Sequence, residues 1–243
     1  MIALVLADGF GNGHVPLTET VPAPLVPVAG RAPLDAALDR LADAGIAEVR
    51  VAAHRHQAKL AAHLAARTAA PRTTLLPLAE PAGPAGAIAQ ALGSAPLLVV
   101  AADALRLDGA SPGLARLAAA WDGERMDALL LVAATVTAVG VPDSGEIFVD
   151  PAGRARPRVG GEVAPYAFAG AQIVHPRLFA DAPAGAAIAA LWTRAAEAER
   201  LWAVVGDGVL CRLASDAARA EAEEIFEALG VWRRPKPAGA AAG

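Results

Sequence analysis

The chain has one cysteine, Cys211, among its 243 residues. A single thiol excludes an internal disulfide and a zinc site built on several cysteines, and it is typical of a reducing compartment. We therefore expect a cytoplasmic protein. Basic residues are not in excess either, because the formal net charge is −4. A protein whose main partner is a nucleic-acid backbone needs a basic face, so we expect no nucleic-acid partner.

Long apolar runs are also missing. The longest, from Ala128 to Val141, is shorter than the roughly 20 residues that cross a bilayer. The N-terminal string MIALVLADG has no basic segment ahead of its apolar stretch, which predicts a buried first strand rather than a signal peptide. We expect no membrane partner. With 55% hydrophobic but only 4% aromatic residues, the composition is globular and indicates close packing of helices on a sheet.

What the chain does contain is an alternation of strand and helix patterns. Apolar runs typical of strands occur at 2–7, 47–54, 73–78, 96–103, 128–135, 146–149 and 166–174, and Cys211 lies in a further predicted strand. Helical spacing follows Gly30 as far as Gly45, and it returns at 57–67, 112–121, 176–179, 186–198 and 216–229. This order predicts an α/β fold with a parallel sheet that is covered by helices on both faces. We expect a single domain at 1–232, followed by a mobile basic tail at 233–243.

Ligands in such sheets bind at the carboxyl ends of the strands. That rule places His54, Gly86, Asp103 and the segment from Gly9 to His14 along one rim. Three glycines in that segment, Gly9, Gly11 and Gly13, are compatible with a dinucleotide loop, a triphosphate loop or a tight turn. The prolines that follow prevent a helix from starting there, and the Gly-Lys-Ser/Thr of a Walker loop is missing.

The longer string LADGFGNGHVPLTETVPAPLVPVAGRAPL is far more specific. It resembles the signature of sugar-1-phosphate nucleotidyltransferases, L-A-A-G-x-G-x-R-M-x-P-L-T followed by P-K-P-L-x-P-V-x-G-x-P-L. Within that family it is most similar to the N-acetylmuramate-1-phosphate uridylyltransferases of cell-wall recycling. The similarity continues through VVAAD, DPAGR and YAFAGAQIVHPRLF, and it covers nearly the whole chain.

The resemblance implies a Rossmann-like, mixed and mostly parallel sheet of the nucleotide-diphospho-sugar transferase type. It implies two partners, a nucleoside triphosphate and a sugar 1-phosphate, with attack on the α-phosphorus and release of pyrophosphate. The nucleotide-binding positions would be Ala7, Asp8, Gly9, Gly11, Gly13, His14 and Gly86. His54 would bind substrate, and Asp103 would be catalytic and would hold Mg²⁺.

The chain departs from the family pattern where positive charge is needed. The loop arginine is replaced by Gly13 and the lysine of P-K-P by Ala23, so that no Lys or Arg lies between Leu6 and Gly30. The second metal aspartate aligns with Arg212, which puts Mg²⁺ in doubt. We expect Arg212 to pair with Asp103, or else to face the phosphates. Phosphoryl-type transfer depends on such cations, so these losses predict an eroded site and a pseudoenzyme with weak or lost activity.

Two alternatives stay open. The chain is an active transferase with a rearranged site that uses Asp103, His14 and Arg212, or it is a non-catalytic binding or regulatory paralogue. The second alternative implies a protein partner or a homo-oligomer.

Overall fold

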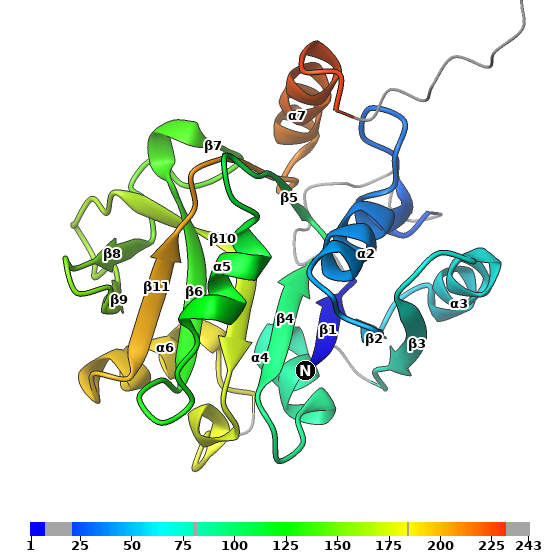
Figure 1. The fold of residues 1–243 in the computed structure, drawn as a ribbon. Helices are drawn as coiled ribbons and strands as arrows, with labels where there is room; N and C mark the ends of the chain where they lie inside the picture. The colour runs from blue at the N-terminus through cyan, green and yellow to red at the C-terminus, as the bar shows by residue number, and fades with distance from the viewer. Residues whose placement is uncertain (8–20, 80–81, 184, 232–243) are drawn as a thin grey trace, which may run out of the picture.

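The computed structural model describes residues 1–7, 21–79, 82–183 and 185–231. Seven strands form the main path of its large sheet: Ile2–Leu6 (β1), Glu48–Ala53 (β2), Arg72–Pro77 (β3), Leu97–Ala101 (β4), Ala128–Ala134 (β6), Tyr166–Val174 (β10) and Leu201–Val205 (β11). Their spatial order is β11-β6-β10-β4-β1-β2-β3 (Figure 1). β1 is parallel to β2 and β4, whereas β10 runs antiparallel to β4 and β6. The mixed, mostly parallel sheet is therefore confirmed.

Helices cover both faces of this sheet, as the alternating pattern predicts. On one face, α2 (Pro33–Asp43), α3 (Gln57–Ala66) and α5 (Gly113–Ala120) contribute to one buried apolar cluster. On the other face, α4 (Gly83–Ala91) and α6 (Ile188–Glu197) contribute to a second cluster. Parallel strands buried on both faces explain why β1 and β4 are continuous apolar runs. Among the described residues, no helix is long and apolar enough to cross a membrane.

Local sequence accounts for the helix that follows the family signature. Leu34, Leu38 and Leu41 recur at helical spacing on α2 and are fully buried. The helix ends where the N–H of Ile46 donates to the Leu41 carbonyl over 2.9 Å, with Gly45 at a φ of +77°. This is the Schellman ending that a glycine after the last helical turn allows. This ending turns the chain back toward β2, the strand that pairs with β1.

A smaller sheet lies at the carboxyl end of β4. In it Ala104–Leu107 (β5), Val209–Arg212 (β12) and Ala138–Val139 (β7) lie in the order β5-β12-β7. Helix α7 (Asp216–Ala228) covers these strands (Figure 1), and its Phe226 packs with Leu105 and Cys211. The Ser215 hydroxyl caps α7 by accepting the N–H of Ala218 over 3.1 Å. The remaining elements are the hairpin Ile147–Val149 (β8) and Ala155–Pro157 (β9), and the 3-10 turns Ala23–Leu25 (η2), Thr135–Thr137 (η3) and Pro176–Phe179 (η4).

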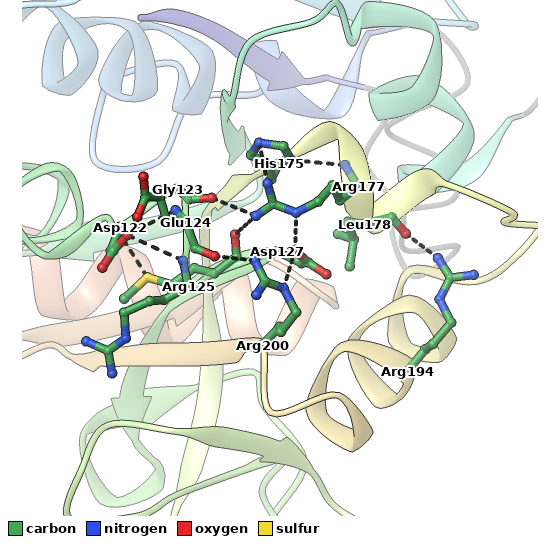
Figure 2. A network of polar contacts seen from close by, with 11 residues as sticks. Asp122, Gly123, Glu124, Arg125, Asp127, His175, Arg177, Leu178, Arg194 and Arg200 are labelled. Atoms are coloured by element: carbon green, nitrogen blue, oxygen red, sulfur yellow. Dashed lines mark hydrogen bonds and ion pairs between the residues drawn. The ribbon is translucent and has the colours of Figure 1, made fainter.

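The opposite end of the large sheet is closed by a network of arginines around Asp127 (Figure 2). One carboxylate oxygen of Asp127 accepts from Nε of Arg177 over 2.9 Å and from Nε of Arg200 over 2.8 Å. Arg177 also donates to the carbonyl of Gly123 over 2.6 Å, and Arg200 to that of Glu124 over 2.7 Å. The network joins the loop before β6 to the ends of β10 and α6.

Four strands of the structure are not among those predicted from the sequence: β5, β7, β9 and β11. β7 has two residues and β9 three, which is too short for an alternation to be recognised. β11 is an apolar run of five residues, and periodicity alone cannot distinguish such a run from a buried piece of helix. The expected tail at 233–243 lies outside the described residues.

Candidate functional site

The carboxyl ends of β1, β2 and β4 meet at one edge of the large sheet (Figure 1). Ala7, the residue after β1, is buried, and its N–H donates to the Ala52 carbonyl over 3.0 Å. The N–H of Ala102 donates to the Leu6 carbonyl, also over 3.0 Å. These bonds fix the point at which the chain leaves β1. The next candidates, Asp8, Gly9, Gly11, Gly13 and His14, lie outside the described residues, and their roles stay predictions.

Asp103 lies at this edge in the tight turn between β4 and β5. Its carbonyl accepts the N–H of Leu213 over 2.8 Å, so β12 is bound directly to the turn. Strand β10 approaches from the other side at Gly170, which has a φ of +72°. A Cβ at Gly170 would lie 2.2 Å from the Cβ of Ala104. Glycine at position 170 therefore allows β10 to pack against the turn that carries Asp103.

Arg212 ends β12 in register with Ala104, the residue after Asp103. Its guanidinium forms a two-point ion pair with Glu146, in which Nη1 donates to Oε1 over 2.8 Å and Nη2 to Oε2 over 2.7 Å. Nη2 also donates to the Phe168 carbonyl over 2.6 Å, while the Phe168 N–H donates to Glu146 over 2.9 Å. The strand register of β10 shifts at this point, and the Glu146–Arg212 pair bonds both backbone groups of Phe168.

The two charges of the pair stabilise each other. Burial alone would raise the pKa of the Glu146 carboxyl, but the hydrogen bonds and charge of Arg212 outweigh burial and lower it. Burial would likewise lower the pKa of the Arg212 guanidinium, but the contacts with Glu146 and the charge of Asp103 raise it. Both groups are therefore ionised at neutral pH. The exposed fractions of their side chains are 20% for Arg212 and 29% for Glu146, so the pair is largely shielded from solvent.

The structure corrects the expected ion pair between Arg212 and Asp103. Glu146 is the direct carboxylate partner of Arg212, and Asp103 acts on the guanidinium through its charge. The reason is geometric, because the carboxylate of Glu146 faces the guanidinium at two points and leaves both of its oxygens satisfied. Sequence reasoning recognised Glu146 only as the start of a strand. It lies 66 positions from Arg212, and no local motif marks the contact.

His54 lies at the same edge, directly after β2, and is half-buried. Its Nδ1 is 3.3 Å from the Leu78 carbonyl, so Nδ1 carries the proton and donates. The amide of Gln57 donates to the carbonyls of Ala53, His54 and Leu78 at 3.0 to 3.1 Å. These contacts bind the end of β2 to the end of β3 and orient the His54 ring. Substrate binding by His54 stays a prediction.

Gly86 lies in the first turns of α4 rather than in a loop before a helix. A Cβ at this position would lie 2.8 Å from the Cβ of Ala82, the residue that precedes the helix. The glycine therefore allows the chain to close tightly at the start of α4. Its role in nucleotide binding stays a prediction.

The large sheet and the helices on both of its faces define a Rossmann-like α/β fold of the nucleotide-diphospho-sugar transferase type. The apo UDP-glucose pyrophosphorylase structure superposes with a TM-score of 0.76 at 16% identity, covering 95% of this chain and 100% of that one. The UTP-bound UGPase from Acinetobacter baumannii gives a TM-score of 0.72 at 16% identity, covering 97% of this chain and 94% of that one. At these identities the similarity establishes the fold alone.

Sequence comparison establishes the family. The model of the nucleotidyl transferase family matches residues 2–131. The N-acetylmuramate alpha-1-phosphate uridylyltransferase of Caulobacter vibrioides is 37% identical over 237 residues, which cover 91% of this chain and 98% of that protein. The chain belongs to the sugar-1-phosphate nucleotidyltransferase family.

Proposed function

We propose that this chain binds UTP and a sugar 1-phosphate at the carboxyl edge of its sheet, and that it transfers UMP weakly or not at all. The acceptor would be N-acetylmuramate 1-phosphate, as the name of the Caulobacter relative suggests. Conservation of the scaffold supports binding. The loss of available positive charge at the edge supports the weak transfer.

The observation that carries this proposal is the closed ion pair between Arg212 and Glu146. Transfer to a sugar phosphate places additional negative charge on phosphate oxygens, and cations must stabilise it. Arg212 is the cation that lies beside Asp103, but Glu146 already matches its charge at two points. To contact a phosphate, Arg212 would have to break its ion pair with Glu146. The Glu146 carboxylate would then be unpaired in a largely shielded site, which is costly.

The segment that resembles the family signature also lacks positive charge. Gly13 and Ala23 stand where the family has an arginine and a lysine, and the acidic Asp8 stands where the family has a small residue. One arginine that acts in the transition state of phosphoryl transfer contributes roughly 10³ to 10⁵ in rate. The combined substitutions therefore support a turnover far below that of relatives with the complete pattern.

Pyrophosphate release tests the proposal directly. The chain and the Caulobacter relative are assayed side by side with UTP, Mg²⁺ and N-acetylmuramate 1-phosphate, while calorimetry measures UTP binding separately. We expect measurable UTP binding with turnover lower than that of the relative by about 10³ or more. Turnover within about tenfold of the relative would contradict the eroded site, whereas failure to bind UTP would contradict the binding role.

A gain-of-function variant provides the matched control. The triple variant Gly13→Arg, Ala23→Lys and Arg212→Asp restores the family residues at the three departures. We expect its turnover to rise above that of the unmodified chain because two phosphate-binding cations and the second metal-ligating carboxylate return. An unchanged rate in a folded triple variant would show that these three positions are not what limits transfer.

A further inference from the structure

Members of the family are expected to use Mg²⁺, and the described residues allow a test of whether this site suits the ion. Mg²⁺ takes oxygen ligands in near-octahedral geometry and is usually held by one or two carboxylates. Asp103 offers one carboxylate, but Arg212 lies beside it in the position where the family has the second aspartate. In the part of the chain that the structure describes, no three His, Cys, Asp or Glu side chains gather into a metal-binding group. These residues do not suit Mg²⁺.

The guanidinium of Arg212 is firmly held. Three hydrogen bonds of 2.6 to 2.8 Å join it to Glu146 and to the carbonyl of Phe168. If it moved away from Asp103, both the Glu146 carboxylate and the Phe168 carbonyl would lose their charge-assisted donor. The guanidinium beside Asp103 is therefore a fixed feature of the fold, and it fills the place of the second carboxylate with a group that offers no oxygen ligand to a metal ion.

We propose that Arg212 occupies the place of the second metal ligand in this chain, so that Asp103 holds no Mg²⁺ and nucleotide binding does not depend on a divalent cation. The part that concerns the nucleotide rests on the proposed function. The part that concerns the ion stands on Arg212, Glu146 and Asp103 alone. The two parts are tested by separate measurements.

The first measurement needs no nucleotide. Mn²⁺ replaces Mg²⁺ as a probe, and electron paramagnetic resonance measures how much of it each variant binds. The quantity of interest is the difference between the Mn²⁺ bound by the wild-type chain and the Mn²⁺ bound by Asp103→Asn. We expect this difference to be zero. We expect Arg212→Asp to gain a Mn²⁺ site, because it exchanges the fixed cation for a second carboxylate, and Arg212→Asp combined with Asp103→Asn to lose it. Mn²⁺ bound at Asp103 in the wild-type chain would overturn the proposal.

Arg212→Asp leaves Glu146 without its partner, so the variant can fail to fold. The double variant Glu146→Gln with Arg212→Asp removes that uncompensated charge, and its fold is checked by circular dichroism. We expect the double variant to gain Mn²⁺ that Asp103→Asn abolishes. A folded double variant that binds no Mn²⁺ would show that Arg212 is not what excludes the ion, and would overturn the proposal.

The second measurement is a calorimetric titration of the wild-type chain with UTP, in EDTA and in excess Mg²⁺. We expect the two dissociation constants to differ by less than about twofold. Tighter binding in Mg²⁺ beyond that range would overturn the proposal while leaving the binding of UTP intact. An absence of UTP binding in both buffers would instead overturn the proposed function, and the Mn²⁺ experiment would still decide whether Asp103 holds an ion.

Discussion

Two ion clusters lie at opposite ends of the large sheet, and they differ in how their charges are matched. At the carboxyl edge, Arg212 and Glu146 form one closed pair that is largely shielded from solvent. At the other end, the single carboxylate of Asp127 accepts from Arg177 and Arg200 (Figure 2). Asp127 is 14% exposed, but its two arginine partners are 41% and 30% exposed. The comparison teaches that a matched, shielded pair makes its charge unavailable to a ligand. The open cluster mainly joins loops.

The largest expected effect comes from breaking the closed pair. Arg212→Ala leaves the Glu146 carboxylate largely buried without its partner and removes the donor to the Phe168 carbonyl. We expect the free energy of unfolding to fall by about 3 kcal/mol. Urea denaturation measures it, and a loss below about 1 kcal/mol would show that the pair is no stronger than a surface contact.

The turn that carries Asp103 can be disturbed from the side of β10. Gly170→Ala introduces a Cβ only 2.2 Å from that of Ala104, at a φ of +72°. We expect a loss of about 2 kcal/mol, since strain and overpacking add. Gly161→Ala is the control, because Gly161 has a similar φ of +82° and nothing within 4 Å of an added Cβ. Equal losses in the two variants would refute the close packing at Gly170.

The stability contributed by the Glu146–Arg212 pair should depend on pH. The pKa of the Glu146 carboxyl is lowered in the folded chain, because the contacts with Arg212 outweigh burial. Its stabilisation is therefore present above the pKa of an unfolded glutamate and is lost as the pH falls through the folded value. The urea midpoints of the wild-type chain and of Glu146→Gln should converge as the pH falls below the pKa of an ordinary glutamate and toward the lowered pKa of Glu146. A constant difference across this range would contradict the assignment.

The smallest effect is expected at the open cluster. Arg177→Ala removes one of two arginines on Asp127, and Arg200 remains in contact with the same carboxylate. We expect a loss of about 1 kcal/mol or less, as for other exposed ion pairs. Urea denaturation compares it with Arg212→Ala. A loss equal to that of Arg212→Ala would remove the distinction between the two clusters.

Sequence patterns predicted the elements whose signals are local. The apolar run of β1 and the leucines of α2 specify a buried strand and an amphipathic helix within a few residues each, and Gly45 marks the helix end. The strands β5 and β7 could not be predicted in this way. They are short, and their stability comes from pairing with β12, which lies far along the chain.

The candidate site shows the same division. Asp103 was placed correctly at the carboxyl edge because an apolar strand ends just before it. The predicted partner of Arg212 was wrong, because the actual partner, Glu146, is 66 positions away and is held near Arg212 by the pairing of β8 with β10. Such features arise from tertiary packing, which a motif read from one stretch of sequence does not contain.

A crystal structure of the chain with UTP and Mg²⁺ tests the central claim most directly. The account predicts that UTP occupies the carboxyl edge while Arg212 still pairs with Glu146, and that no metal ion contacts Asp103. A magnesium ion coordinated by Asp103 and the phosphates of UTP, with Arg212 turned away from Glu146, would contradict it.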